Sequence, residues 1–221
     1  MYMSEVRLRK DRGGTGALAA FLAGAAESIG QSHHLVWSLF PDRDGKRDFV
    51  YRMIGTGPSE PILLYSPEPV VDAHGLWEVR TRPFTLADNL MVGDQLSWSI
   101  RVNAVVHSGG KKHDLVTHAR VGGDDAHRDD IAGRVIPPWL ETKLAAAGLD
   151  APASDMIVQA QVSRSFRRDP RGRGAPVKIG TTDLRGRGTV CNPEALAGAL
   201  REGIGKGKAY GCGMLLINRI P

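Results

Sequence analysis

Five glycines and two lysines gather in a short segment near the C-terminal end of this 221-residue chain. The segment runs from Gly203 to Gly213 and reads GIGKGKAYGCG. Glycine permits positive φ and a close approach of the backbone to a ligand, and successive N–H groups beside ammonium groups can cradle a phosphate. A simple turn between a helix and a strand should need only one or two glycines, so we interpret this segment as a phosphate-binding loop. Its candidate residues are Gly203, Gly205, Gly207, Gly211, Gly213, Lys206 and Lys208.

The two familiar nucleotide-binding loops do not match this segment. A P-loop requires the string GxxxxGK[ST], which the sequence lacks. A dinucleotide fingerprint lies between a strand and a following helix, whereas this loop is expected to follow a helix and precede a strand. The pattern therefore argues against ATP and NAD, and no cofactor is expected.

A second feature is a local concentration of positive charge. The whole chain carries 29 Lys and Arg against 24 Asp and Glu, a net charge of +5. Residues 1–108 hold 11 basic and 12 acidic residues, whereas the segment from Arg164 to Cys191 alone holds eight basic and two acidic ones. Such a stripe is typical of a surface that binds a phosphate backbone. A solvated Arg-Gly loop is an equally good interpretation of the charge alone.

The histidines and cysteines are less specific. His107, His113 and His118 have no HxxxH spacing and no cysteine partner, so we interpret them as surface residues and expect no metal site. His33 and His34 enter or lie on a predicted helix, and a histidine can transfer protons near neutral pH. The pattern alone favours an ordinary surface or half-buried His33. Two cysteines build neither a disulfide framework nor a four-ligand zinc site.

The composition limits the class of protein. Hydrophobic residues make up 42% of the chain, which is enough for a packed core. No apolar run approaches the ~18 residues of a membrane helix, and the N-terminus alternates like a strand instead of resembling a signal peptide. We expect a soluble, cytoplasmic protein.

The first half of the sequence predicts the elements of one α+β domain. The expected order of strand, helix, strand, strand, short helical element and strand is that of a ferredoxin-like βαββαβ unit. This order predicts an N-terminal domain over 1–108 with an antiparallel sheet. The expected strands are 2–9, 49–54, 61–66 and 93–106, the run 77–82 is a candidate for another strand, and the helix is 17–39, interrupted at Gly30.

The second half predicts a similar unit. A linker at 109–130 is expected to precede a second ferredoxin-like domain over 131–221, which makes the fold class α+β with two tandem domains. A helix should begin at Pro137 and end near Ala147, and a second one should be capped by Asn192. The expected strands are 156–166, 177–184, 188–191 and 214–217, with a polar turn at 167–175.

Three strings carry a resemblance to a known family. They are the N-terminal strand MYMSEV, the string QSHHLVWSLFPD at 31–42, and the loop from Gly203 to Gly213. The run Arg101-Val102-Asn103-Ala104 and the pair Asp48-Phe49 support them. The chain resembles, from end to end, the CasE-type CRISPR-associated endoribonucleases of the RAMP superfamily, which process precursor CRISPR RNA in type I-E systems.

The resemblance implies a reaction and a catalytic residue. It implies metal-independent cleavage at the 3′ base of the repeat hairpin by 2′-OH attack, giving a 2′,3′-cyclic phosphate and a 5′-OH. The family's histidine lies four residues before the Trp of WxLF, which is His33 here, with His34 as the alternative. Gly30 stands where some relatives have an assisting Tyr, and Ala104 replaces the family's Pro. The second catalytic group is therefore open, with a lysine or His34 as candidates.

The resemblance also gives the basic segment a specific role. The major groove of A-form RNA is deep and narrow, so a hairpin is recognised through its shape and its phosphates. A basic β-hairpin, together with the two loop lysines, is expected to hold the repeat hairpin. The candidate RNA-binding residues are Arg164, Arg167, Arg168, Arg171, Arg173, Lys178, Arg185, Arg187, Lys206 and Lys208.

The sequence leaves three functions open. The first is a protein that cuts repeat RNA and retains the product hairpin as a Cascade subunit. The second is a subunit that binds the hairpin in the same complex without catalysis. A generic ferredoxin-like RNA-binding module is the third interpretation. It is disfavoured because the sequence lacks RNP-type aromatic strings. The expected partners are the CRISPR repeat RNA hairpin and other subunits of the type I-E complex, and no membrane.

Overall fold

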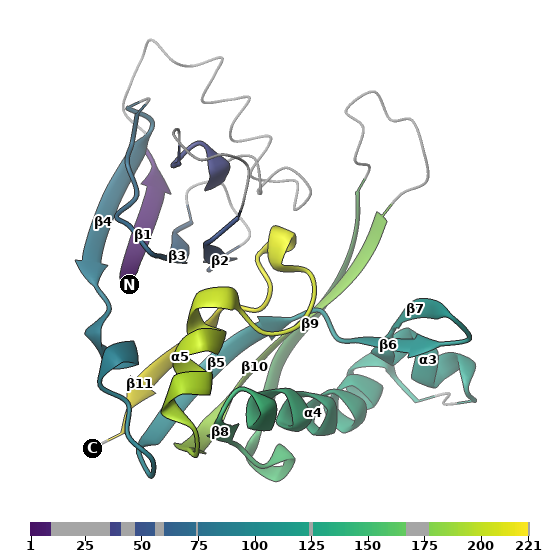
Figure 1. Cartoon of the computed structure of the whole chain (residues 1–221). Coiled ribbons are helices and arrows are strands. Elements are labelled where there is room, and N and C mark those ends of the chain that lie inside the picture. Colours follow the sequence, from purple (N-terminus) through teal and green to yellow (C-terminus); the bar gives the residue numbers. More distant parts are fainter. Residues whose placement is uncertain are drawn as a thin grey trace.

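Two antiparallel sheets form the framework of the protein, seen in a computed structural model (Figure 1). The structure describes residues 1–9, 36–40, 47–55, 60–73, 75–123, 126–166 and 177–220. Among these residues, no helix is long and apolar enough to cross a membrane.

The first sheet contains the N-terminal strands. β1 (Tyr2–Leu8), β2 (Val50–Met53), β3 (Ile62–Ser66) and β4 (Trp77–Pro83) pair in the order β2-β3-β1-β4. Every neighbouring pair is antiparallel. Because β3 lies between β1 and β2, this is the split βαβ arrangement of a ferredoxin-like unit.

An aromatic core covers one face of this sheet. Phe49, just before β2, stacks on Phe40 with ring centroids 4.5 Å apart and meets the edge of Trp37 at 5.3 Å. Leu39 is 1% exposed. Leu39 and Phe40 are buried in this core, Trp37 packs against it half-buried, and this packing fixes the segment Val36–Phe40 against the start of β2.

The second sheet repeats the same strand arrangement. It consists of β5 (Gln95–Val102), β9 (Ile157–Phe166), β10 (Val177–Val190) and β11 (Leu215–Arg219), with the short β8 (Leu149–Asp150) beside β10. β10 lies between β5 and β9, and β11 pairs with the other edge of β5, all antiparallel. In chain order this is again a split βαβ followed by a fourth strand. The predicted α+β class with two tandem ferredoxin-like units is therefore confirmed.

One strand belongs to a different sheet from the one that the sequence predicted. Gln95–Val102 was expected to close the first unit, but it opens the second, between β10 and β11. Both edges of β1 are already occupied by β3 and β4, so no place beside it is left. We therefore propose that the domain boundary lies between Pro83 and Gln95, where the short 3₁₀ helix η1 (Thr85–Asp88) connects the sheets.

Two helices cover one face of the second sheet. α4 (Arg128–Ala146) precedes β9, and α5 (Pro193–Glu202) precedes β11. Asn192 caps α5 as predicted, because its side chain accepts a 3.0 Å hydrogen bond from the N–H of Ala195. η2 (Ala153–Asp155) follows β8, and η3 (Lys208–Tyr210) lies inside the glycine-rich segment.

The predicted start of α4 at Pro137 is wrong. The helix begins at Arg128 and runs through both prolines, although each lacks the N–H that would bond to the preceding turn. The helix continues because Ile131, Ile136 and Leu140 are all within 1% of full burial on its core face. Packing of this apolar face outweighs the two missing hydrogen bonds.

The predicted linker at 109–130 is largely folded. β6 (Val105–Ser108) and β7 (Lys111–Asp114) form a hairpin, and α3 (Leu115–Val121) follows at once. Asp114 ends the hairpin and caps α3, since its carboxylate accepts a 2.9 Å hydrogen bond from the N–H of Thr117. This β6–β7–α3 appendage projects from the second unit on the side toward which β9 and β10 also extend (Figure 1).

Candidate nucleic-acid interface

The loop Gly203–Gly213 links α5 to β11 through a series of tight turns. All five of its glycines have positive φ, between 74° and 87°, a region that other residues rarely adopt. An added Cβ would lie 2.6 Å from the Ile204 carbonyl oxygen at Gly213, and 2.9 Å from Val50 at Gly203. The expectation that one or two glycines would suffice here is wrong. The glycines are needed for the backbone path, so they do not indicate a ligand by themselves.

The loop is clamped between the two sheets. Tyr51 of β2 donates a 2.7 Å hydrogen bond from its hydroxyl to the carbonyl of Ala209. The N–H of Gly213 donates to the carbonyl of Arg101 on β5 at 2.7 Å, and Asn103 forms an isolated β-bridge with Lys206. In Figure 1 the loop accordingly runs, in yellow, between the two sheets. Both predicted lysines are therefore held at the junction of the two units, Lys206 exposed and Lys208 half-buried.

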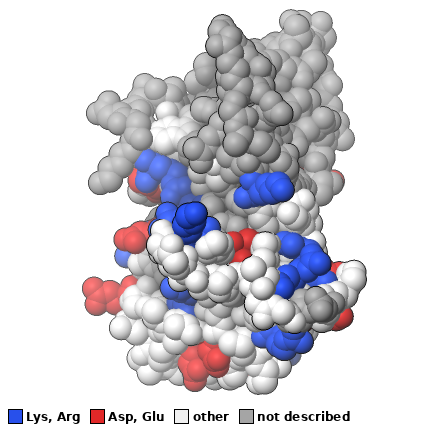
Figure 2. Space-filling model, turned by 90° about the vertical axis from the view of Figure 1, so that its right-hand side faces the viewer, with Lys and Arg blue, Asp and Glu red and all other residues white. Residues whose placement is uncertain are grey.

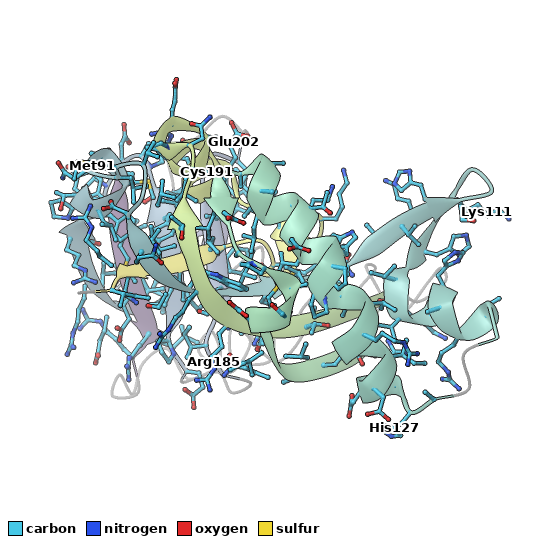
Figure 3. The ribbon with its side chains drawn as sticks, turned by 90° about the horizontal axis from the view of Figure 1, so that it is seen from below. Met91, Lys111, His127, Arg185, Cys191 and Glu202 are labelled. Carbon is cyan, nitrogen blue, oxygen red and sulfur yellow. The ribbon has the colours of Figure 1, made fainter. Side chains whose placement is uncertain are left out.

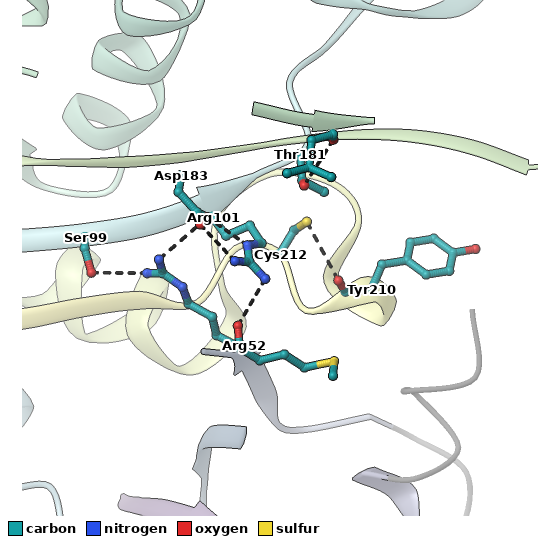
Figure 4. A network of polar contacts seen from close by, with 9 residues as sticks. Arg52, Ser99, Arg101, Thr181, Asp183, Tyr210 and Cys212 are labelled. Atoms are coloured by element: carbon teal, nitrogen blue, oxygen red, sulfur yellow. Dashed lines mark hydrogen bonds and ion pairs between the residues drawn. The ribbon is translucent and has the colours of Figure 1, made fainter. Parts of the chain in front are cut away.

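A charged network joins the sheets beneath this loop (Figure 4). Arg101 donates from Nε and Nη2 to both oxygens of Asp183 on β10, at 2.7 and 2.8 Å, and from Nη1 to the carbonyl of Met53 at 3.0 Å. Arg52 of β2 reaches the same carboxylate at 3.6 Å and donates to Ser99 at 3.1 Å. Arg101, part of the string that supported the family resemblance, thus fastens the first sheet to the second.

The pKa values of the two arginines in the network shift in opposite directions. The hydrogen bonds to Asp183 raise the pKa of Arg101. Burial lowers the pKa of Arg52, since desolvation there exceeds the attraction of the shared carboxylate. Its Nε has no hydrogen-bond partner among the described residues. One carboxylate therefore serves two cations, and the junction between the sheets keeps an excess positive charge.

A hollow of about 500 Å³ opens beside the glycine-rich loop. Its walls come from both units: Arg47 and Phe49 before β2, Tyr65 and the residues after β3, the end of α5, and Lys208. The charged residues around it are the cations Arg47, Arg201 and Lys208 and the carboxylates Asp48 and Glu202, so positive charge is in excess. Burial and the nearby Arg47 lower the pKa of Lys208. Positive groups from three separate segments therefore converge here.

The predicted residues on β10 do not form one stripe. In an extended strand, side chains alternate between the two faces. Lys178 therefore lies on the face that bears α4 and α5, whereas Arg185 and Arg187 lie on the other, paired across from Ser99 and Ser97. All three are exposed. Figure 3 shows Arg185 far from Lys111 of the β6–β7–α3 appendage. The predicted contact of Arg185 and Arg187 with the RNA hairpin stays a prediction.

Several predicted residues lie outside the described residues. They are the candidate catalytic His33 and His34, and Arg167, Arg168, Arg171 and Arg173 of the basic turn; the side chain of Arg164 is likewise not described. Their roles stay predictions.

Figure 2 shows several separate patches of Lys and Arg on one side of the molecule. This is the side that carries the β6–β7–α3 appendage. Lys111 and Lys112 on β7 and Arg120 on α3 lie on the appendage. His113 and His118 are 5.5 Å apart between ring centroids. Among the residues that the structure describes, no group of three His, Cys, Asp or Glu side chains is placed to hold a metal ion.

Sequence reasoning missed two of the three cations around the hollow. Arg47 immediately precedes Asp48-Phe49, a pair that the family resemblance had already singled out, so its position was a usable signal. Arg201 gave no such signal, because a cation in the last turn of a helix is explained by the helix dipole alone.

Comparisons with known proteins all find CRISPR-associated proteins, and their matches cover most or all of the chain. A family described as CRISPR associated protein matches residues 1–219. The Cascade subunit CasE of Escherichia coli strain K12 is 27% identical over 188 residues, which cover 84% of this chain and 89% of that protein. The structure of Thermus thermophilus Cse3 bound to an RNA representing a pre-cleavage complex superposes with a TM-score of 0.70 at 20% identity, covering 98% of both chains. Cas6e from Escherichia coli K-12 gives 0.60 at 22% identity over the full length of both.

Proposed function

Because the chain belongs to the family of CRISPR-associated proteins, whose match spans residues 1–219, we propose that it is an endoribonuclease that processes precursor CRISPR RNA. This end-to-end match is the observation that carries the proposal. It is supported by the similarity to a Cascade subunit, and by the shared fold with proteins named as CRISPR endoribonucleases and solved with RNA. We propose that this protein also retains the product hairpin within a Cascade complex. A cytoplasmic location is part of the same proposal.

The proposed reaction is cleavage at the 3′ base of the repeat hairpin. The 2′-OH beside the scissile phosphate attacks the phosphorus, the 5′-oxygen leaves, and the products are a 2′,3′-cyclic phosphate and a 5′-OH. A base must take the 2′-OH proton, an acid must protonate the leaving oxygen, and cations must stabilise the added phosphorane charge. Side chains can supply all three, so the proposed reaction requires no metal ion.

His33 is the proposed proton-transfer residue, with His34 as the alternative. This assignment rests on the family resemblance, because both histidines lie outside the described residues. Val36–Phe40 packs against Phe49, which also lines the hollow with Arg47 and Lys208. Lys208 is a candidate for the open second catalytic group.

The proposed contacts to the RNA hairpin are assigned by the face of β10 on which each side chain lies. The turn at Arg167, Arg168, Arg171 and Arg173, with Arg164 and Lys178 beside it, is the proposed contact to the phosphates of the stem. Arg185 and Arg187 lie on the opposite face of β10, so their proposed contact with the RNA is separate from that of Lys178. Lys206 remains a proposed phosphate ligand because it is exposed at the junction of the two units.

The decisive test is cleavage of the cognate repeat RNA in EDTA. The proposal expects cleavage to persist in EDTA, to give a cyclic phosphate end, and to be lost in His33→Ala while RNA binding is kept. His107→Ala is the matched control, since His107 is an exposed histidine on β6 and should leave cleavage unchanged. Loss of wild-type cleavage in EDTA would exclude the metal-independent mechanism. Full activity of His33→Ala would exclude this residue, and the same test on His34→Ala would then decide between the two.

The alternative is an RNA-binding subunit of the same complex that performs no cleavage. Gly30, in the place of an assisting Tyr, is the observation that favours it. Tight binding of the repeat hairpin by wild-type protein, without any cleaved product over a long incubation, would support this alternative.

A further inference from the structure

The hollow beside the glycine-rich loop has the composition of an anion site. It is shared by the two units, because Arg47 precedes β2 of the first sheet whereas Arg201 ends α5 and Lys208 lies in the loop of the second. Phe49 and Tyr65, each 1% exposed, contribute an apolar floor. A site with an apolar floor and a few converging polar groups is the usual form of a ligand pocket.

The three cations in this hollow outnumber the two carboxylates that line it, Asp48 and Glu202. Among the described residues, no ion pair within 4 Å engages Arg47, Arg201 or Lys208. The nearby Glu202 attracts Lys208, but burial and the repulsion of Arg47 and Lys206 prevail and lower its pKa. Crowded, partly desolvated cations raise the free energy of the empty site, and a bound anion would remove that cost.

The position of Lys208 is fixed by the fold. It begins the 3₁₀ turn η3, which is bounded by Gly207 and Gly211 in the left-handed conformation. The hydroxyl of Tyr51 holds the next residue, Ala209, through its 2.7 Å hydrogen bond. The loop therefore presents Lys208 toward the first unit without further ordering, which favours binding of a ligand.

The volume of the hollow limits which part of an RNA can bind there. A volume of about 500 Å³ is within the range of small-ligand pockets and far too small for a double helix. A single nucleotide fits, with its phosphate between the cations and its sugar and base over the apolar floor. The paired stem is excluded for the same reason.

We propose that this hollow binds one unpaired nucleotide of the repeat RNA, outside the hairpin stem, with its phosphate between Arg47 and Lys208. The proposal rests on the proposed function, since it takes RNA as the ligand. Arg201 adds a third positive charge at the rim. Two chain segments far apart in the sequence thereby read the strand that leaves the stem.

The test measures affinity for two RNAs, one being the repeat hairpin with its unpaired flanks and the other the stem-loop alone. Arg47→Ala and Lys208→Ala should each weaken binding of the flanked RNA about tenfold and reduce its salt dependence by about one phosphate contact. Binding of the stem-loop alone should be unchanged. Arg80→Ala and Lys143→Ala are matched controls, because both residues are exposed and lie away from the hollow. Both controls should bind the flanked RNA as wild type does.

The outcomes separate this inference from the proposed function. If wild-type protein binds neither RNA, the proposed function fails and the inference fails with it. If wild type binds both and the two variants bind the flanked RNA equally well, the inference alone is wrong. Equal losses on both RNAs would also overturn it, since that result places the cations on the stem. A last outcome is that wild-type protein binds inorganic phosphate at millimolar concentration, and that this binding, but not RNA binding, is lost in Arg47→Ala and Lys208→Ala. The site would then take free phosphate, and the nucleotide assignment would be wrong.

Discussion

Asp183 offers the sharpest test of how the two units are held together. Its carboxylate accepts two short hydrogen bonds from Arg101 and lies 3.6 Å from Arg52. The side chains of Arg52, Arg101 and Asp183 are only 10%, 19% and 18% exposed. Asp183→Asn keeps the shape of the side chain but removes the charge. Two largely buried guanidinium groups would then face each other without a counter-charge.

The expected cost can be bounded from these contacts. Removing one partner of a buried ion pair costs roughly 3–5 kcal/mol, and the remaining exposure of this site reduces the figure. Because Asn still offers one acceptor oxygen to Arg101, we expect Asp183→Asn to lower the free energy of unfolding by about 2–4 kcal/mol. Urea denaturation measures this loss as a lower midpoint at an unchanged slope.

A matched control uses an exposed ion pair. Glu5 and Arg7 on β1 pair at 2.8 Å, but their side chains are 33% and 50% exposed. Exposed pairs contribute ~0–1 kcal/mol, so Glu5→Ala should cost no more than that. If Asp183→Asn is no more costly than Glu5→Ala, the network beneath the glycine-rich loop does not stabilise the fold. The argument that Arg101 fastens the sheets would then be refuted.

Two further predictions concern the loop and the cysteines. Gly213→Ala should destabilise the protein by at least about 2 kcal/mol, because its φ is +87° and its Cβ would meet the Ile204 carbonyl at 2.6 Å; Gly198→Ala, in open space on α5, should stabilise by about 0.5–1 kcal/mol. Equal effects of the two in thermal melts would contradict the packing argument. Burial raises the pKa of the Cys212 thiol to about 12, whereas Cys191 is exposed, so a thiol reagent at pH 8 should label only Cys191 in native protein and both residues in denaturant. Rapid labelling of Cys212 in the native protein would show that the junction opens.

Local elements were largely predictable from the sequence because their signals are local. Alternation in Tyr2–Leu8 and Gln95–Val102 identified strands, and Asn192 followed by Pro193 marked the start of α5. The split βαβ order in each half indicated a ferredoxin-like class. The same local signals misplaced the start of α4, since the prolines at 137 and 138 indicate a helix start only when no buried apolar face extends the helix in front of them.

Tertiary structure decided which strands meet and which charges converge. β5 was assigned to the wrong sheet because its alternation fixes a buried face but does not specify its neighbours. Lys178 and Arg185 share one basic segment, yet the two-residue period of a strand places them on opposite faces.

The sequence by itself determined the family resemblance, the fold class and the position of the glycine-rich loop, since all three depend on residues close together in the chain. The hollow between Arg47, Arg201 and Lys208 was decided only when two sheets docked through Arg52, Arg101 and Asp183. Electrostatic repulsion and desolvation act on distances in space, and those distances are set by the packing of the whole chain.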